Sequence, residues 1–333
     1  MGKKIILVFP NFKLFEKFTI TPHQPSLSLG YLAGMLKEKG IDFDVIDARA
    51  ENLSIGKLLK RIEHYNPEYV SLTVNIAFSY AAIYTSLKIK HCFPKIKIIM
   101  GGPWATAEYE TIIKKKYADY VILGEGEYSM LELLEANNDF SKLEKVIGLA
   151  YSEQGNVKNT GRRPFITDLD ALPFPPWEYF PRKGYYKSVR IKPAYPLITT
   201  RGCPFNCLNC TKIVHGHKLR KRSIPNILKE IEYLKSIGCK EIIIEDDMFN
   251  YDLGRLKELL REIIKGKFNM KFQLSNGIRA DFIDQELAYL LYAAGVYRVA
   301  IGIESGSQAV VNFLQKRLDL KVVPKAVDQL KKA

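Results

Sequence analysis

Three cysteines within eight residues are the part of this sequence that could do chemistry most directly. Cys203, Cys207 and Cys210 have the spacing CxxxCxxC and follow the strand-like run 196–200. Three thiolates on a short loop can bind three irons of a 4Fe-4S cluster and leave the fourth iron open, because full protein ligation needs four cysteines. Two alternatives stay open: a zinc site with His215 or His217 as the fourth ligand, and three incidental thiols.

The elements that must position this loop alternate between strand and helix. Apolar strand-like runs separated by helical patterns extend from residue 1 to about residue 140, which predicts a doubly wound, Rossmann-like α/β domain. The expected strands are 5–9, 43–46, 69–74, 96–100, 120–123 and, beyond that boundary, 146–151. Residues 141–195 are interpreted as a proline-rich linker, because prolines from Pro164 onward prevent helix and central strand.

The alternation resumes over residues 196–333 and predicts a second α/β domain. Four strand–helix units in series indicate a partial barrel, whose chemistry belongs at the carboxyl ends of its strands. Asp246 and Asp247 follow the run 241–245, Ser275 and Arg279 follow 271–274, and Glu304 follows 297–303. Taken singly, each acidic residue is more often a surface or capping carboxylate, so the argument rests on the ordered set behind the cysteines.

This ordered set resembles the radical S-adenosylmethionine (SAM) superfamily. The stretch Thr199–Cys210 matches its cysteine motif, and 242–249, 275–281 and 302–307 match its later strand motifs in order. The resemblance implies a 4Fe-4S cluster on Cys203, Cys207 and Cys210, with the open iron chelating SAM. It also implies that an external electron donor of the flavodoxin or ferredoxin type reduces the cluster, which then cleaves SAM to a 5′-deoxyadenosyl radical.

The same resemblance implies roles for the residues that would contact SAM. Asp246 and Asp247 would accept hydrogen bonds from its ammonium, Arg279 would pair with its carboxylate, and Glu304 would meet its ribose hydroxyls. The implied SAM contacts also include Phe205, Asn209 and Ser275. The family usually has an aromatic residue where this chain has Asn209, so we expect a weaker adenine contact.

The N-terminal domain resembles the cobalamin-binding domain of enzymes related to the anaerobic magnesium-protoporphyrin ester cyclase. The similarity is carried by residues 25–33, 100–106, 124–127 and 168–177. It implies cobalamin contacts at Ser26, Leu27, Gly101, Gly102, Trp104, Gly124 and Glu125. Glycines at the carboxyl ends of parallel strands allow a close approach of a flat cofactor, although such glycines usually serve tight turns.

No histidine is expected on the cobalt of that cofactor. The sequence lacks an Asp-x-His-x-x-Gly loop, and His23, His64 and His91 are isolated. The resemblance therefore implies cobalamin with a detached lower base. Relatives commonly have histidine where this chain has Trp104.

Composition sets further limits on location and partners. The net charge of +14 is spread over lysine-rich helix faces, which disfavours nucleic acid as a partner. No apolar run is long enough to span a membrane and no signal-peptide pattern begins the chain, so a cytoplasmic location is expected. Barrels of this class continue beyond the point where this chain ends, so we expect a truncated barrel that a partner could complete.

The leading functional hypothesis is cobalamin-dependent radical SAM chemistry at an unactivated carbon, either methyl transfer or cyclisation. The expected substrate is a small molecule, with a tetrapyrrole or a lipid as the nearest variants. Methylthio transfer to transfer RNA is disfavoured, because those enzymes carry three further N-terminal cysteines and this domain has only Cys92. The alternative is a non-catalytic or partner-completed subunit that binds cobalamin, the cluster or both.

Overall fold

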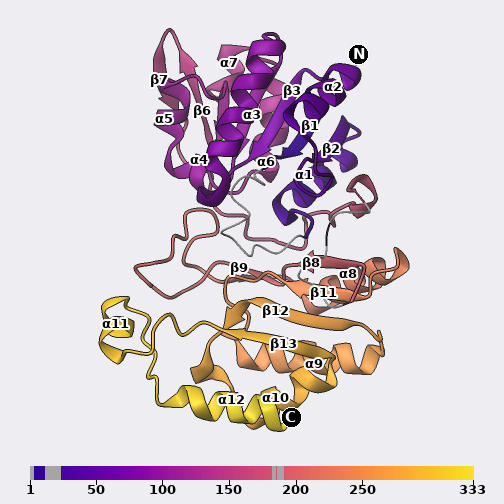
Figure 1. Cartoon of the computed structure of the whole chain (residues 1–333), viewed down its shortest axis with the longest axis vertical. Helices are drawn as coiled ribbons and strands as arrows, with labels where there is room; N and C mark the ends of the chain where they lie inside the picture. Colours follow the sequence, from indigo (N-terminus) through magenta and orange to yellow (C-terminus); the bar gives the residue numbers. More distant parts are fainter. Residues whose placement is uncertain (1–3, 12–23, 182–184, 186–190) are drawn as a thin grey trace. The chain divides into compact units, whose positions relative to one another are not determined.

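The structure is a computed structural model that describes residues 4–11, 24–181, 185 and 191–333. The chain divides into two compact units. The first comprises residues 1–166 and 171–188, and the second comprises 167–170 and 189–333. Figure 1 labels most of the helices and strands of both units.

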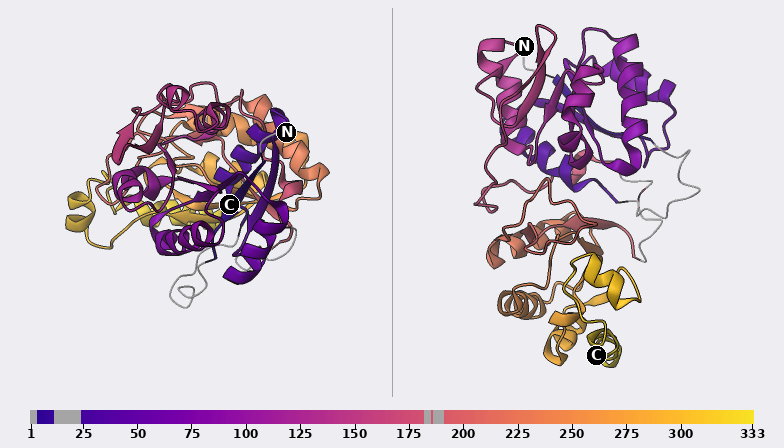
Figure 2. Two further views of the ribbon diagram at one scale, coloured as in Figure 1. Left: turned by 90° about the horizontal axis from the view of Figure 1, so that it is seen from above. Right: turned by 90° about the vertical axis from the view of Figure 1, so that its left-hand side faces the viewer.

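The described residues of the first unit form a seven-stranded sheet with helices on both faces (Figure 1, Figure 2). The strand order is β2-β1-β3-β4-β5-β6-β7, and the first five strands run parallel. The strands are β1 (Lys4–Phe9), β2 (Asp42–Asp47), β3 (Tyr69–Thr73), β4 (Lys97–Gly101), β5 (Tyr120–Ile122), β6 (Leu149–Glu153) and β7 (Asn156–Asn159). The helices are α1 (Leu27–Glu38), α2 (Ile55–Tyr65), α3 (Ser79–Cys92), α4 (Pro103–Ala107), α5 (Tyr109–Lys114), α6 (Glu127–Ala136) and α7 (Phe140–Leu143), with 3₁₀ turns η2 (Ile76–Phe78) and η3 (Trp177–Tyr179).

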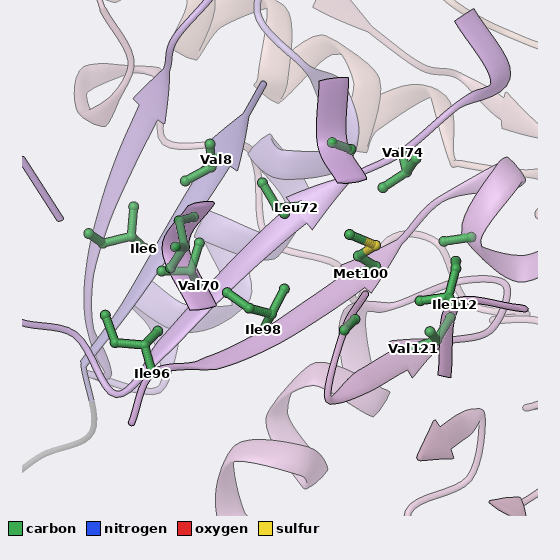
Figure 3. Packing of buried hydrophobic residues seen from close by; sticks show 14 of the residues in the cluster. Ile6, Val8, Val70, Leu72, Val74, Ile96, Ile98, Met100, Ile112 and Val121 are labelled. Carbon is green, nitrogen blue, oxygen red and sulfur yellow. The ribbon is translucent and has the colours of Figure 1, made fainter. Parts of the chain in front are cut away.

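The predicted doubly wound arrangement is present because the parallel strands are buried on both faces. Residues Ile5, Ile6, Leu7 and Val8 of β1 are all completely buried. On one face, Ile6, Val70 and Ile98 belong to a core that also includes side chains of α2, α3 and α5 (Figure 3). Strands covered in this way have continuous apolar runs rather than alternating ones.

The sheet continues beyond the boundary predicted at residue 140. β6 pairs antiparallel with β5, and β7 pairs antiparallel with β6, so residues 149–159 belong to the sheet. β6 overlaps the expected strand 146–151, whereas the start of the linker at residue 141 was placed too early. Gln154 and Gly155 make the hairpin turn with φ of 51° and 83°. Positive φ at both central residues is the turn geometry that matches the twist of paired strands.

Residues 172–177, the proline-dense segment, pack on α1 within the first unit. Ser26 caps this helix, and Gly30 and Gly34 lie one turn apart on the face that meets the segment. A Cβ on Gly30 would lie 2.8 Å from Pro175 Cβ and from a ring carbon of Trp177. Trp177 is only 2% exposed. The prolines thus form part of the core of this unit.

The described residues of the second unit form a four-stranded parallel sheet of order β13-β12-β11-β8. Its strands are β8 (Ala194–Leu197), β11 (Glu241–Ile244), β12 (Lys271–Ile278) and β13 (Val296–Ile301), and a separate antiparallel pair consists of β9 (Thr200–Arg201) and β10 (Arg220–Lys221). The helices are α8 (Ile224–Ser236), α9 (Leu253–Gly266), α10 (Gln285–Ala293), α11 (Gln308–Phe313) and α12 (Val322–Lys332), with the 3₁₀ turn η4 (Ala280–Phe282). The α/β class predicted for this half is confirmed.

The sequence predicts no membrane-spanning segment. Among the residues that the structure describes, no helix is both long enough and apolar enough to cross a bilayer.

Candidate functional site

The three cysteines lie on a loop that a short antiparallel pair closes. β9 pairs with β10, so residues 202–219 leave and return at the same place. Gly202 has a φ of +91°, and a Cβ there would lie 2.4 Å from Lys218 O, so the entry to the loop requires glycine. Inside the loop, the Cys203 N–H donates to Gly216 O at 3.2 Å. These contacts fix the base of the loop close to the end of β8.

All three thiols are free within the described part of the chain. Cys203 and Cys207 are half-buried, whereas Cys210 is exposed. Burial raises the pKa of the Cys203 thiol above its ordinary value. Among the described residues no group of three or more His, Cys, Asp or Glu side chains is gathered tightly enough to hold a metal ion. The donor set of three thiols on one closed loop fits a 4Fe-4S cluster, because the ligands of such sites assemble around the metal as it binds.

The zinc alternative depended on a fourth ligand from His215 or His217. His215 Nδ1 lies 2.8 Å from Asp247 Oδ2. That carboxylate also accepts a hydrogen bond from the Gly202 N–H at 2.8 Å, so it links both ends of the cysteine loop. His215 therefore has a structural partner, which weakens the case for zinc.

The two adjacent aspartates after β11 have different environments. Asp247 has a side chain that is 38% exposed beside the cysteine loop, where it contacts Gly202 and His215. The pKa of Asp247 is lowered: burial opposes this, and the hydrogen bond and charge of His215 outweigh it. Asp247 is thus available to the site.

Asp246 is placed in the protein core. It is 1% exposed, and its carboxylate accepts hydrogen bonds from the Thr199 N–H, the Thr199 hydroxyl and the Thr200 hydroxyl. Burial raises its pKa. These contacts tie the end of β11 to the start of β9, and they leave the predicted role of Asp246 as a SAM contact without support.

Arg279 also differs from its predicted role. Its guanidinium makes a two-point ion pair with Asp281 at 2.9 and 2.7 Å, and it donates to Lys316 O at 2.6 Å and to Arg317 O at 2.7 Å. The residue is 6% exposed. Because the N–H donors of this guanidinium already bind partners within the chain, it does not offer the two parallel donors that a carboxylate ligand needs.

Two predicted SAM contacts from distant parts of the sequence do come together. Asn209 Nδ2 donates to Glu304 Oε2 at 3.3 Å, across 95 residues of sequence. Phe205 lies half-buried in the same loop, and Ser275 lies half-buried on β12 at the irregular register between Leu274 and Ile278. Glu304 therefore contacts the cysteine loop through Asn209, as Asp247 does through Gly202 and His215.

One residue at this edge escaped the sequence analysis. Lys316 is 9% exposed, and its ammonium lies 2.9 Å from Glu304 Oε1. It follows α11 and lies between Gln315 and Arg317 in the sequence, so nothing in the local pattern distinguished it from the many other lysines of the chain.

In the first unit, hydroxyl groups gather at the start of α1. Ser26 Oγ lies 3.0 Å from Ser28 Oγ, which lies 3.4 Å from Thr73 Oγ1 at the end of β3. Leu27 is the first residue of the helix and is half-buried. This arrangement gives the carboxyl edge of the parallel strands a polar, accessible surface.

The glycines at that edge have unequal roles. A Cβ on Gly101 would meet nothing closer than 3.9 Å, so the backbone there is open to a ligand. Gly102 has a φ of +103°, and a Cβ would lie 2.7 Å from Val74 O, so this glycine serves the turn into α4. Gly124 has a φ of +78° and donates its N–H to Thr106 Oγ1 at 3.1 Å. Gly101 thus fits a bound cofactor, whereas Gly102 and Gly124 are explained by their turns.

Two further residues assigned to cobalamin have structural contacts in the first unit. Trp104 is partly buried and packs against the core of the sheet. Glu125 is 6% exposed and accepts a hydrogen bond from the Ile166 N–H at 2.8 Å. His64 and His91 are exposed on α2 and α3, and His23 lies outside the described residues. Cobalamin contacts by Trp104 and Glu125 stay predictions without support from these contacts.

Comparison with known proteins defines the class to which this arrangement belongs. The B12 binding domain family matches residues 18–134, and the radical SAM superfamily matches residues 197–333. The class is therefore a protein with a B12-binding domain followed by a radical SAM domain. The chain is 31% identical over 333 residues to a Pyrococcus horikoshii protein named as an uncharacterized methyltransferase, covering 99% of this chain and 71% of that protein. The chain belongs to this family of B12-binding radical SAM proteins.

Two more relatives have named activities. The chain is 26% identical to cytidylyl-2-hydroxyethylphosphonate methyltransferase of Streptomyces wedmorensis, over 95% of this chain and 67% of that enzyme. It is 26% identical to anaerobic magnesium-protoporphyrin IX monomethyl ester cyclase of Cereibacter sphaeroides, over 99% of this chain and 55% of that enzyme. The chain thus spans between 55% and 71% of the length of these three relatives.

Solved structures confirm the fold. The radical SAM methyltransferase TsrM from Kitasatospora setae, with cobalamin and a [4Fe-4S] cluster bound, has a TM-score of 0.75 at 18% identity, covering 100% of this chain and 67% of that chain. The cobalamin-dependent SAM radical enzyme OxsB has a TM-score of 0.79 at 22% identity, covering 99% of this chain and 48% of that chain. The predicted cofactor set of cobalamin, SAM and a 4Fe-4S cluster is the set of this family.

Proposed function

We propose that this chain performs cobalamin-dependent radical SAM chemistry and that its reaction is methyl transfer to an unactivated carbon of a small molecule. The observation that carries the proposal is the closed loop with three free thiols, whose Gly202 N–H and Asn209 amide donate to the carboxylates of Asp247 and Glu304. Two of the three relatives named above are methyltransferases, which favours methyl transfer over the cyclisation that the third relative's name describes.

The residues of the second unit would divide the work of binding. Cys203, Cys207 and Cys210 would hold the cluster. Glu304 and Asn209 would meet the ribose hydroxyls, and Asp247 would face the ammonium of SAM. When bound, a reduced cluster would supply the electron for SAM cleavage, and cobalamin would serve as the methyl carrier.

The first unit would hold cobalamin at the carboxyl edge of its parallel strands. Ser26, Ser28 and Thr73 offer hydroxyl groups, Leu27 offers an apolar contact, and Gly101 leaves the backbone open to close approach. The expected substrate remains a small molecule, with tetrapyrroles and lipids as the nearest classes. The electron donor of the flavodoxin or ferredoxin type remains a prediction.

The first test reconstitutes the protein anaerobically with iron and sulfide, then adds SAM, cobalamin and a strong reductant. We expect 5′-deoxyadenosine and S-adenosylhomocysteine, measured by chromatography. The first product would come from reductive cleavage of SAM, and the second from SAM that has donated its methyl group. The Cys203→Ala variant should lose both products, whereas Cys92→Ala, an exposed cysteine of the other unit, should retain them. A cluster that forms without either product would refute the enzymatic proposal for this chain and favour a partner-completed binding subunit.

A further inference from the structure

The segment 314–317, which follows α11, contacts the cysteine loop directly and through Arg279. The Leu208 N–H, between the second and third cysteines, donates to Leu314 O at 3.0 Å. The carbonyls of Lys316 and Arg317 accept from the Arg279 guanidinium at 2.6 and 2.7 Å. The segment is therefore hydrogen-bonded to the cysteine loop at Leu314 and to Arg279 at Lys316 and Arg317.

Arg279 carries this connection back to the loop. Its Cζ atom lies 4.0 Å from the centre of the Phe205 ring, between the first and second cysteines. A guanidinium over an aromatic face is attractive, and more so when both groups are shielded from water. The guanidinium of Arg279, whose contacts leave its predicted role toward SAM without support, packs on Phe205 in the first half of the cysteine loop.

Lys316 makes a second connection through its ammonium. The ammonium donates to one carboxylate oxygen of Glu304 at 2.9 Å, and the other oxygen accepts from the Asn209 amide at 3.3 Å. The Lys316 side chain is 11% exposed, so its charge is largely withdrawn from water and depends on this carboxylate. Lys316 thus accepts a hydrogen bond from Arg279 at its backbone carbonyl and donates one to Glu304 from its ammonium. Through Glu304 it is linked to Asn209.

The backbone around these contacts is held in an unfavourable conformation. Glu304, Gln315 and Arg317 have φ of 65°, 54° and 54°. Residues other than glycine cost about 1 kcal/mol each in this region and persist where surrounding contacts hold them. The Lys316 ammonium holds the Glu304 side chain and Arg279 holds the Arg317 carbonyl, whereas the Gln315 N–H donates to Asn312 O at 2.9 Å at the end of α11.

We propose that Lys316 is a positioning residue that orients Glu304 and restrains the cysteine loop, and that it thereby sets the affinity for SAM. The part that concerns SAM rests on the proposed function, whereas the restraint of the loop is a property of the chain itself. The two parts can therefore be measured separately.

The restraint is tested on the metal-free full chain by hydrogen exchange with mass spectrometry. Lys316→Met keeps the apolar stem and removes the ammonium. We expect peptides covering 203–210 to exchange at least about fivefold faster, because a charge-assisted hydrogen bond is lost. Lys257→Met is the matched control: Lys257 has a side chain 16% exposed and pairs with Asp284 and Glu286, each at 2.7 Å, on the helices α9 and α10. The control should leave the exchange rate of peptides covering 203–210 unchanged. The same exchange rate of these peptides in Lys316→Met and Lys257→Met would overturn the proposal.

The affinity is tested by titrating SAM into cluster-loaded protein and following the signal of the reduced cluster by electron paramagnetic resonance. Lys316→Met should assemble the same iron content as the unchanged protein and bind SAM about tenfold more weakly, whereas Lys316→Arg should recover most of that loss. Unchanged SAM affinity in Lys316→Met overturns the positioning role. If the unchanged protein binds no SAM while exchange at 203–210 still rises in Lys316→Met, the proposed function fails and the restraint stands.

A surface variant keeps the test independent of the buried lysine. Asn209→Ala removes the far end of the same set of contacts at an exposed position, so folding should be unaffected. We expect faster exchange at 203–210 and weaker SAM binding, both smaller than in Lys316→Met. Additive effects of the two substitutions in the double variant would argue against a shared contact through Glu304.

Discussion

At the scale of single residues, Asp246 and Asp247 show how neighbours of the same type acquire opposite roles. β11 is buried along its whole length, so its pattern does not reveal which of the next side chains points inward. Three hydrogen bonds from Thr199 and Thr200 decide the matter for Asp246.

Asp246→Ala should lower the free energy of unfolding by about 2–4 kcal/mol, because it leaves the threonine donors unpaired in the core. Asp247→Ala, at the exposed neighbour, should cost under about 1 kcal/mol. Urea denaturation of the metal-free chain, followed by circular dichroism, measures both. A stable Asp246→Ala protein that has lost SAM binding would restore the role predicted from the sequence.

Asp47 at the end of β2 links one residue to the pH dependence of stability. Burial raises its pKa to about 6, although hydrogen bonds from the Ala50 N–H and the Tyr185 hydroxyl act in the opposite direction. The folded chain then binds a proton that the unfolded chain releases at lower pH. The contribution of Asp47 to stability is therefore greatest below about pH 4 and is lost as the pH rises toward about 6.

Asp47→Asn should remove this loss, because the amide is neutral at every pH. We expect the variant to be more stable than the unchanged chain at pH 7.5 by about 1–2 kcal/mol, with little difference at pH 4. Urea denaturation at both pH values measures the change, and Asp42→Asn, half-exposed at the other end of the same strand, is the control. A variant less stable at pH 7.5 would show that the ionised carboxylate is favourable in place.

At the scale of elements, the contact between α1 and the proline-dense segment explains two glycines inside a helix. Glycine within a helix costs about 1 kcal/mol relative to alanine, so its presence needs a reason. At Gly30 a Cβ would lie 2.8 Å from Pro175 and from Trp177, and at Gly34 a Cβ would lie 3.1 Å from Phe174 O and from Pro173, so the close approach of the segment favours glycine at both positions.

Gly30→Ala should destabilise the protein by about 1–3 kcal/mol, because the added methyl overlaps buried atoms that have little room to move. The matched control is Gly56→Ala on α2, where a Cβ would meet nothing within 4 Å. There the substitution should stabilise the protein by about 0.5–1 kcal/mol through helix propensity. Thermal unfolding of both variants tests the pair, and shifts of the same sign would contradict the packing explanation.

At the same scale, the end of the first sheet was mispredicted for a physical reason. Apolar runs indicate strands, but the direction of β6 depends on its pairing with β5 and on the tight turn at Gln154–Gly155. Short polar β7 has no apolar pattern of its own, since only one of its residues is partly buried. Such an edge strand is decided by its pairing with the neighbouring strand and not by an apolar pattern of its own.

At the scale of the whole molecule, the sequence by itself determined the class of the protein. The cysteine spacing is local, and strand–helix alternation places later motifs at the carboxyl ends of parallel strands. From these two facts the later motifs are expected at the same edge of the sheet as the cysteine loop, and the structure adds that the Asn209 amide donates to the Glu304 carboxylate. The domain order and the cofactor set follow from the same motifs.

Tertiary structure alone decided which polar side chains remain available to a ligand. Asp246 and Arg279 are satisfied by partners in the core, and Lys316 reaches Glu304 from a segment without a recognisable motif. The reason is that a buried polar group must find hydrogen-bond partners, and these can come from any part of the chain that packing brings near. Spacing along the sequence determines what chemistry is possible, and packing in space determines which residues are free to perform it.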